Sequence, residues 1–255
     1  MLFDLRGKRK RLVQVSYAAL AAIFLVGFVG FSIGSGNAPG GLFDAIGLGG
    51  DSGSQGSVTS QFDDQIDAAN QQLAKNPKDT QALLKLADAE FQKAKTGVTQ
   101  DPSSGQISVS GDAHTELGNS ADAWEKYLKL NKGKPDVDVA GDMVNTYYLL
   151  NDAQGAAQAQ RVVAEHTPSS GAYGQLAFFL YASYDIAGGD VAAKKAEDLA
   201  TSKAQRDQTK QQLASMRKQA VKIKKQQAKA AKNAPPTTPG ANPLESPFGG
   251  FGTTP

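Results

Sequence analysis

The chain has 255 residues, no cysteine and only two histidines, and its formal net charge is +2. The lack of cysteine excludes a disulfide framework, thiolate metal sites and a cysteine nucleophile, and neither His114 nor His166 has a second histidine at metal-ligand spacing. The charge is unevenly distributed: residues 1–11 carry +4, residues 12–200 carry −10 and residues 201–232 carry +9. No phosphate-binding loop, dinucleotide fingerprint or nucleophile elbow occurs, so we expect a protein without enzymatic activity, cofactor or metal.

A transmembrane helix is predicted over residues 12–33, LVQVSYAALAAIFLVGFVGFSI, which contain no Asp, Glu, Lys, Arg or His. At about 1.5 Å per residue, this helix would be roughly 33 Å long, enough to cross a hydrocarbon core of about 30 Å. Five basic residues precede it: Arg6, Lys8, Arg9, Lys10 and Arg11. By the positive-inside rule, we expect a single-pass protein of the cytoplasmic membrane with a cytoplasmic N-terminus and an extracytoplasmic C-terminal domain.

A cleaved signal peptide is the alternative interpretation of the same segment. It is disfavoured because the apolar run is longer than an ordinary signal-peptide core and no A-x-A cleavage site follows. Small residues at Ala18 and Ala22, and again at Gly30 and Gly34, have the spacing that lets two membrane helices pack closely. A homodimer through the span is therefore compatible with the sequence.

The next segment, residues 34–59, is rich in Gly and Ser and has no helical period, which predicts a flexible linker. Helical spacing begins at Ser60 and predicts a helix to about Lys75, ended by Asn76-Pro77. Asp79 or Thr80 is placed to cap a second helix that continues to Gly97.

An insertion is predicted at about residues 97–117. Within it, Val98 and Thr99 face Ile107 and Val109 across a turn, a pattern that permits a small hairpin. An insertion of this length in a helical domain is either functional or merely tolerated, and we favour the second interpretation. Helical order resumes near Ser120, and further helices are predicted over residues 120–130, 139–150, 153–165, 172–184 and 191–200, the last two separated by Gly188-Gly189.

Residues recur at spacings of 32 to 36 positions. Ala123 and Ala157 are 34 residues apart, and a larger set recurs after one insertion of about 24 residues. The set is Leu83, Leu86, Ala87 and Phe91, then Gly141, Val144, Asn145 and Leu149, then Tyr173, Leu176, Ala177 and Tyr181. The periodicity predicts an all-α chain of stacked helical hairpins.

This spacing of large and small residues resembles the tetratricopeptide repeat over residues 60–200, with Gly141 and Asn145 departing from its pattern. The resemblance implies a lone helix followed by three degenerate repeats, whose first helices line a concave groove that binds a protein or peptide. The family's inner-face positions fall on Leu84, Asp88, Asp142, Thr146 and Phe178, each of which is otherwise explained as scaffold.

A basic helix is predicted over residues 201–232. Leu213, Met216, Ala220 and Ile223 follow a 3–4–3 spacing and form one narrow stripe, as expected of a helix that caps the last repeat. Its lysines suit nucleic acid, anionic lipid or an acidic partner, but no aromatic residues alternate with them, so we do not expect specific nucleic-acid recognition. Residues 233–255 are rich in Pro, Gly and Thr and are predicted to be disordered.

These features together predict a membrane-anchored scaffold for protein–protein interaction. The architecture looks like that of bacterial single-span repeat proteins that accompany the secretion machinery and envelope chaperones. The alternative is a structural tether, in which the basic helix of residues 201–232 holds anionic envelope polymers or lipid. No particular partner follows from the residues.

Overall fold

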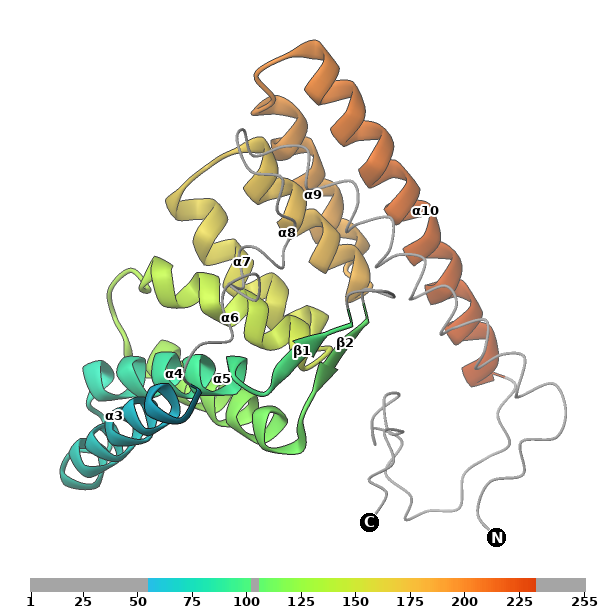
Figure 1. The fold of residues 1–255 in the computed structure, drawn as a ribbon. Helices are drawn as coiled ribbons and strands as arrows, with labels where there is room; N and C mark the ends of the chain where they lie inside the picture. Colours follow the sequence, from blue (N-terminus) through green and yellow to red (C-terminus); the bar gives the residue numbers. More distant parts are fainter. Residues whose placement is uncertain (1–54, 102–105, 233–255) are drawn as a thin grey trace, which may run out of the picture.

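A computed structural model of the chain describes residues 55–101 and 106–232 (Figure 1). The predicted basic segment of residues 1–11, the predicted span of residues 12–33 and the predicted tail of residues 233–255 lie outside the described residues. No helix in the part that is described combines the length and apolar character needed to cross a membrane.

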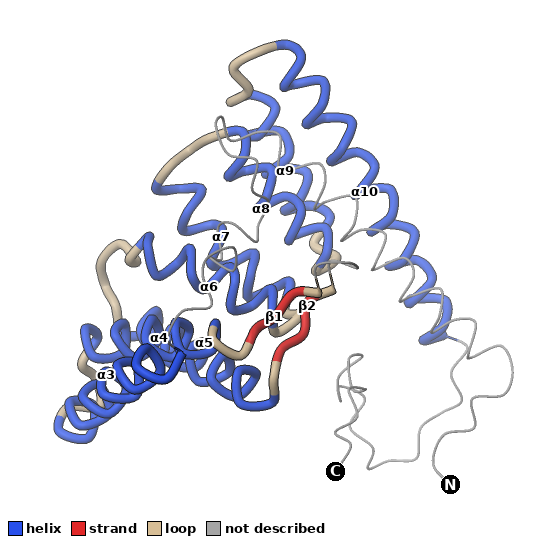
Figure 2. Tube along the Cα trace, in the orientation of Figure 1, coloured by secondary structure: helices blue, strands red, loops and turns tan. Residues whose placement is uncertain are grey.

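The described residues form eight helices and one two-stranded hairpin, which confirms the all-α prediction (Figure 2). The helices are α3 (Gln55–Lys75), α4 (Thr80–Lys95), α5 (Gly111–Leu130), α6 (Val137–Leu149), α7 (Ala153–His166), α8 (Ser170–Ala182), α9 (Ile186–Asp198) and α10 (Lys203–Lys232). The strands are β1 (Val98–Gln100) and β2 (Ile107–Val109).

Each of the six helices from α4 to α9 begins directly after an Asp or Ser whose side chain accepts hydrogen bonds from backbone N–H groups of the first turn. These caps are Asp79, Ser110, Asp136, Asp152, Ser169 and Asp185. Such side chains satisfy N–H groups that have no partner inside the helix, and each cap contributes roughly 1 kcal/mol. The predicted cap at Asp79 is confirmed, because its carboxylate accepts from the N–H groups of Gln81 and Ala82.

The helices pack as consecutive hairpins. α4 packs on α5, α6 on α7 and α8 on α9, and neighbouring pairs meet through α5 with α6 and α7 with α8. α3 lies against α4 at one end of this stack, and α10 covers α8 and α9 at the other (Figure 1). The order of one leading helix, three hairpins and one closing helix is the arrangement that the spacing of the sequence predicts.

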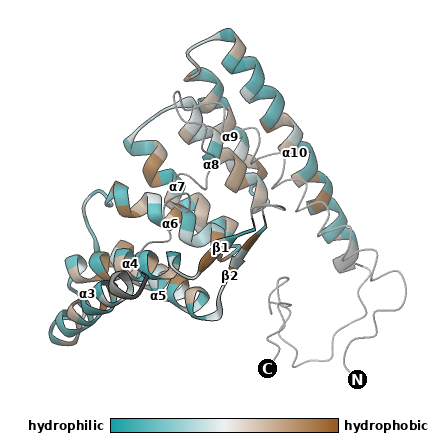
Figure 3. Cartoon of the chain, in the orientation of Figure 1, coloured by the Kyte–Doolittle hydropathy of each residue, from teal (hydrophilic) through white to brown (hydrophobic). Residues whose placement is uncertain are grey.

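The core follows the repeated residues. Leu83 and Phe91 of α4, Trp124 of α5 and Leu176 of α8 are buried in one continuous apolar cluster. The stripe predicted for α10 is also buried: Leu213, Met216, Ala220 and Ile223 are each at most 4% exposed. α10 is otherwise largely hydrophilic, with short hydrophobic bands along its length (Figure 3).

Three predicted boundaries are wrong. The linker predicted over residues 34–59 overlaps α3, which begins at Gln55. Helix α5 begins at Gly111 instead of near Ser120, since Ser110 caps it and Ala113 and Leu117 extend its buried face. The connection that interrupts the helices is therefore shorter than the predicted residues 97–117.

The third wrong boundary is the start of α9, at Ile186 instead of residue 191. Gly188 and Gly189 lie inside its first turn and do not separate it from α8. The side chain of Asp185 accepts from the N–H of Gly188 at 2.9 Å, so the capped turn includes both glycines.

The predicted hairpin is confirmed inside the connection between α4 and α5. β1 pairs antiparallel with β2, with Val98 opposite Val109 and Gln100 opposite Ile107. Gly97 precedes β1, and a Cβ there would lie 2.5 Å from Oγ of Ser110, so only glycine fits this crossing.

Two of the hairpins share one type of corner. A Cβ added to Gly155 of α7 would lie 2.3 Å from the ring of Tyr147, and one added to Gly189 of α9 would lie 2.4 Å from the ring of Tyr181. Before each second helix stands one residue with positive φ, Asn151 at 58° and Tyr184 at 62°. In both corners a tyrosine of the first helix therefore lies directly over the glycine backbone of the second.

Candidate peptide-binding face

The five predicted groove residues come from the first helix of each hairpin. Leu84 and Asp88 lie on α4, Asp142 and Thr146 on α6, and Phe178 on α8. Helices α4 and α6 contact one another directly, although they belong to different hairpins. The stacking thus brings residues about 54 positions apart in the sequence to adjoining helices, as the resemblance implied.

Asp88 and Asp142 form an acidic pair across α4 and α6. Burial is the main cause that raises the pKa of Asp142 to about 6, and the negative charges of Asp88 and Asp138 raise it further. Lys95 acts in the opposite direction on this pKa. A carboxylate held in such surroundings is stabilised when a cation approaches, because the cation offsets both the desolvation of the charge and the repulsion from the neighbouring carboxylates.

Lys95, whose charge opposes the rise in the pKa of Asp142, is only loosely associated with this pair. Nε2 of Gln92 donates to Oδ1 of Asp88 at 3.2 Å, and Nζ of Lys95 donates to Oε1 of Gln92 at 3.3 Å. Nζ of Lys95 also lies 5.7 Å from the ring centroid of Phe91. Lys95 therefore reaches the acidic pair through an amide and makes no ion pair with either carboxylate.

Thr146 does not belong to an open face. Its side chain is fully buried, and its hydroxyl donates to the backbone carbonyl of Asp142 at 3.1 Å. A docked peptide cannot contact this hydroxyl, so the prediction that Thr146 lines a groove is wrong. The residue supports α6 from within the core instead.

Leu84 and Phe178 are half-buried and pack against the core from α4 and α8. The ring of Phe178 makes an edge contact with that of Phe179, with centroids 5.1 Å apart. Leu84 lies one turn before Asp88 on α4, and Phe178 adds a half-buried apolar group on α8. We call Leu84, Asp88, Asp142 and Phe178 the inner-helix set.

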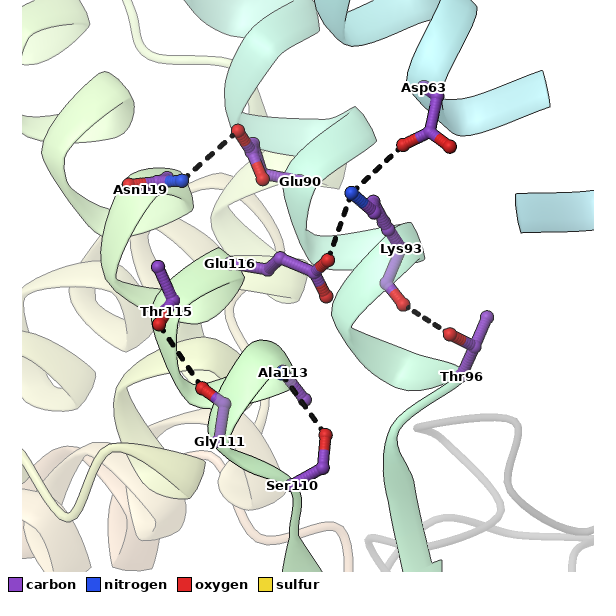
Figure 4. Close-up of polar contacts among 10 residues, drawn as sticks. All are labelled: Asp63, Glu90, Lys93, Thr96, Ser110, Gly111, Ala113, Thr115, Glu116 and Asn119. Atoms are coloured by element: carbon purple, nitrogen blue, oxygen red, sulfur yellow. Dashed lines mark hydrogen bonds and ion pairs between the residues drawn. The ribbon is translucent and has the colours of Figure 1, made fainter. Parts of the chain in front are cut away.

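A second polar cluster, which the sequence did not predict, joins α3, α4 and α5 (Figure 4). Nζ of Lys93 lies 2.8 Å from Oδ1 of Asp63 and 3.1 Å from Oε1 of Glu116, so one lysine links three helices. These two bonds are the main causes that raise the pKa of Lys93. Periodicity conveys nothing about such pairs, because the partners are 30 and 23 residues from Lys93 in sequence.

Glu90 belongs to the same cluster and is 6% exposed. Nδ2 of Asn119 donates to its Oε1 at 3.3 Å. Burial raises the pKa of Glu90, and the bond from Asn119 and the charge of Lys93 offset part of that rise. The cluster holds α3 onto the first hairpin, and its charged groups are paired with one another or with Asn119, so we regard it as structural.

The other end of the stack has its own polar contacts between α9 and α10. Nε and Nη2 of Arg217 donate to the two carboxylate oxygens of Asp190 at 2.7 and 3.0 Å, and the hydroxyl of Tyr181 donates to Oδ1 at 2.8 Å. Nζ of Lys224 donates to the backbone carbonyl of Tyr184 at 2.9 Å. These bonds fix the rotation of α10 on the last hairpin.

Over residues 55–101 and 106–232, no group of three or more His, Asp or Glu side chains is placed to hold a metal ion. Comparison with protein-family models and with curated proteins finds no match to this chain. The candidate site therefore depends on the geometry described above.

Proposed function

We propose that this protein is a membrane-anchored scaffold that holds a partner protein through the inner-helix set. The observation that carries the proposal is the acidic pair of Asp88 and Asp142 on α4 and α6. The half-buried Leu84 and Phe178 lie on first helices of the same stack of hairpins. Half-buried carboxylates beside apolar side chains favour a partner segment that has both basic and apolar residues. The resemblance to tetratricopeptide repeats supports the same mode of binding.

The proposed location is the outer side of the cytoplasmic membrane of a bacterium. The support for it is the apolar segment of residues 12–33 and the five basic residues before it. In this arrangement the predicted span anchors the chain, and the hairpins display the inner-helix set to envelope or secreted proteins. A role in assisting secretion or assembly of such proteins follows from the architecture that the chain resembles.

Site-specific photo-crosslinking in intact cells tests this proposal. A photo-reactive phenylalanine replaces Leu84 or Phe178 in the full chain, and a third variant carries it at the exposed Gln71 of α3 as a control. We expect one protein adduct at both inner-helix positions and none at position 71. Substitution of Asp88 and Asp142 by Asn should weaken that adduct. Equal labelling at all three positions contradicts the proposal.

The second candidate function is a tether, supported by the net charge of +9 on residues 201–232. In that case anionic envelope material binds α10, and the hairpins act as a spacer. The same crosslinking method distinguishes the two, because a tether predicts adducts from exposed positions of α10 and none from Leu84 or Phe178.

A further inference from the structure

Two groups among the ten basic residues of α10 differ in their contacts. Arg217 and Lys224 lie beside the docked stripe and bond to Asp190 and to the carbonyl of Tyr184. A second group, Lys218, Lys222, Lys225 and Lys229, is exposed. In the part of the chain that the structure describes, none of these four makes an ion pair or a hydrogen bond. We call these four the lysine row.

The lysine row lies opposite the buried stripe of α10. Its spacings of 4, 3 and 4 keep the four side chains on one helical face, about 16 Å long at 1.5 Å per residue. The stripe of Leu213, Met216, Ala220 and Ile223 has the same periodicity on the other face and packs on α8 and α9. The docking of α10 therefore orients the row away from the hairpins.

No negative charge compensates this face from within α10. The only acidic residue in the helix is Asp207, about three turns before Lys218. The apolar stripe is used in folding, so α10 cannot insert into a bilayer as an amphipathic helix while it remains docked. A ligand of this face must accordingly be bound by charge alone.

We propose that the lysine row docks on the anionic headgroups of the membrane in which the chain is anchored. The proposal rests on the proposed membrane anchoring, because the predicted span and linker would keep the whole domain, α10 included, near that surface at a high effective concentration. Lysine ammonium groups suit dispersed headgroup phosphates, and a Lys near an anionic bilayer strengthens association by about fivefold. No aromatic residue stands in α10 to stack on nucleic-acid bases.

Such docking would lay the closing end of the stack on the bilayer. Helix α10 lies at the opposite end of the hairpins from α3 (Figure 1). The inner-helix set on α4, α6 and α8 would then remain free for a protein partner while the lysine row is occupied. Lipid composition and ionic strength would thereby control how the domain is presented.

The test uses the full chain labelled with a dye at Gln211→Cys, a unique thiol on the exposed side of α10, since the chain has no cysteine. Energy transfer from this dye to headgroup-labelled lipid is measured in vesicles of phosphatidylcholine with or without 30% phosphatidylglycerol. We expect higher transfer in the anionic vesicles, and loss of the excess in about 0.5 M NaCl. The variant K218Q/K222Q/K225Q/K229Q should lose at least 80% of the excess.

The matched control is K78Q/K85Q/K126Q/K132Q, which removes the same four charges from exposed positions elsewhere. It should retain the excess transfer, and circular dichroism should show that both variants keep their helices. Equal transfer in the two vesicle types, or equal loss in both variants, overturns the proposal. The proposal is also overturned if linear polyphosphate releases the lysine row from anionic vesicles at a lower phosphate concentration than competing anionic lipid does.

Resistance of the chain to alkaline carbonate extraction is measured separately and reports insertion of the predicted span. A chain that is extracted refutes the proposed anchoring. The lysine row of an extracted chain is still tested by the vesicle experiment. Preference for anionic over neutral vesicles supports the role of the row, and equal binding to both refutes it. The two failures are thus distinguishable.

Discussion

Arg217 of α10 and Asp190 of α9 form a bidentate ion pair with N–O distances of 2.7 and 3.0 Å. This bond is the main cause that lowers the pKa of Asp190, and the hydroxyl of Tyr181 completes the site. The pair sits beside the buried stripe of α10 and fixes which face of that helix is turned outward. It thereby connects the packing of the last hairpin to the exposure of the lysine row.

The first prediction concerns the energy of this pair. Both side chains are more than 40% exposed, so solvent screens the pair and we expect only a weak coupling between D190A and R217A. A double-mutant cycle measures it, with urea unfolding followed by the fluorescence of Trp124, the only tryptophan in the chain. The coupling should fall in 1 M NaCl. A cycle on the exposed pair of Lys194 and Asp198 serves as the reference, and a coupling for Arg217 that 1 M NaCl leaves unchanged would contradict our assignment.

The second prediction concerns the apolar part of the same interface. Met216→Ala removes a side chain that is 1% exposed between α10 and the last hairpin, and should cost about 2–4 kcal/mol of unfolding free energy. Gln211→Ala, on the exposed side of α10, should change it by less than about 0.5 kcal/mol. Hydrogen exchange should show faster exchange throughout α10 in the Met216 variant. If α10 is not docked in solution, both substitutions will be equally harmless.

The third prediction compares two helical glycines. Gly155→Ala places a Cβ 2.3 Å from the ring of Tyr147, which is 5% exposed and cannot move aside, so we expect a loss of about 1–3 kcal/mol. Gly141→Ala, in α6, meets nothing within 4 Å and should gain about 0.5–1 kcal/mol from helix propensity. Urea unfolding of the two variants gives the comparison. Equal effects would mean that the tyrosine does not lie over Gly155.

The fourth prediction concerns the pH dependence of stability at the acidic pair. Because the pKa of Asp142 is raised to about 6, the folded state binds a proton that the unfolded state has released between about pH 4 and pH 6. The contribution of Asp142 to the unfolding free energy is therefore fully present below pH 4 and is lost as the pH rises through 6. The Asp142→Asn variant should have the same unfolding free energy as the parent chain at pH 4. At pH 7.5 its unfolding free energy should be higher than that of the parent by about 1–3 kcal/mol.

The control for Asp142 is Asp64→Asn, an exposed carboxylate of α3. Its stability should differ little from that of the parent chain at either pH. If Asp142→Asn shows the same difference from the parent at pH 4 and pH 7.5, Asp142 does not have the raised pKa described here. The proposal that a basic segment of a partner binds beside Asp142 would then lose its support.

Periodicity predicted most of the helical order because apolar spacing directly reflects which helical face is buried. It predicted the helices that contain Leu83, Ala157 and Leu176, and it predicted the buried stripe of Leu213 and Met216. It failed where local chemistry overrides composition. Gly188 and Gly189 looked like a break, yet the cap of Asp185 and the ring of Tyr181 require small residues inside the helix.

The candidate face could be predicted only in part. Spacing placed Asp88 and Asp142 on neighbouring helices, but it could not distinguish them from Thr146, which the packing buries. Long side chains also join helices in a way that no periodic pattern encodes. Lys93 contacts Asp63 and Glu116. Arg217 contacts Asp190. Such pairs become visible only when the relative rotation of the helices is known.

Protease protection on intact spheroplasts most directly tests the proposal that the hairpins stand outside the cytoplasmic membrane. An epitope tag is placed after Pro255, and a cytoplasmic protein serves as the control for lysis. We predict that external protease removes the tag and degrades the hairpins while the control protein stays intact. Full protection of the tag and hairpins until the membrane is lysed would contradict the proposal, because the helices would then face the cytoplasm.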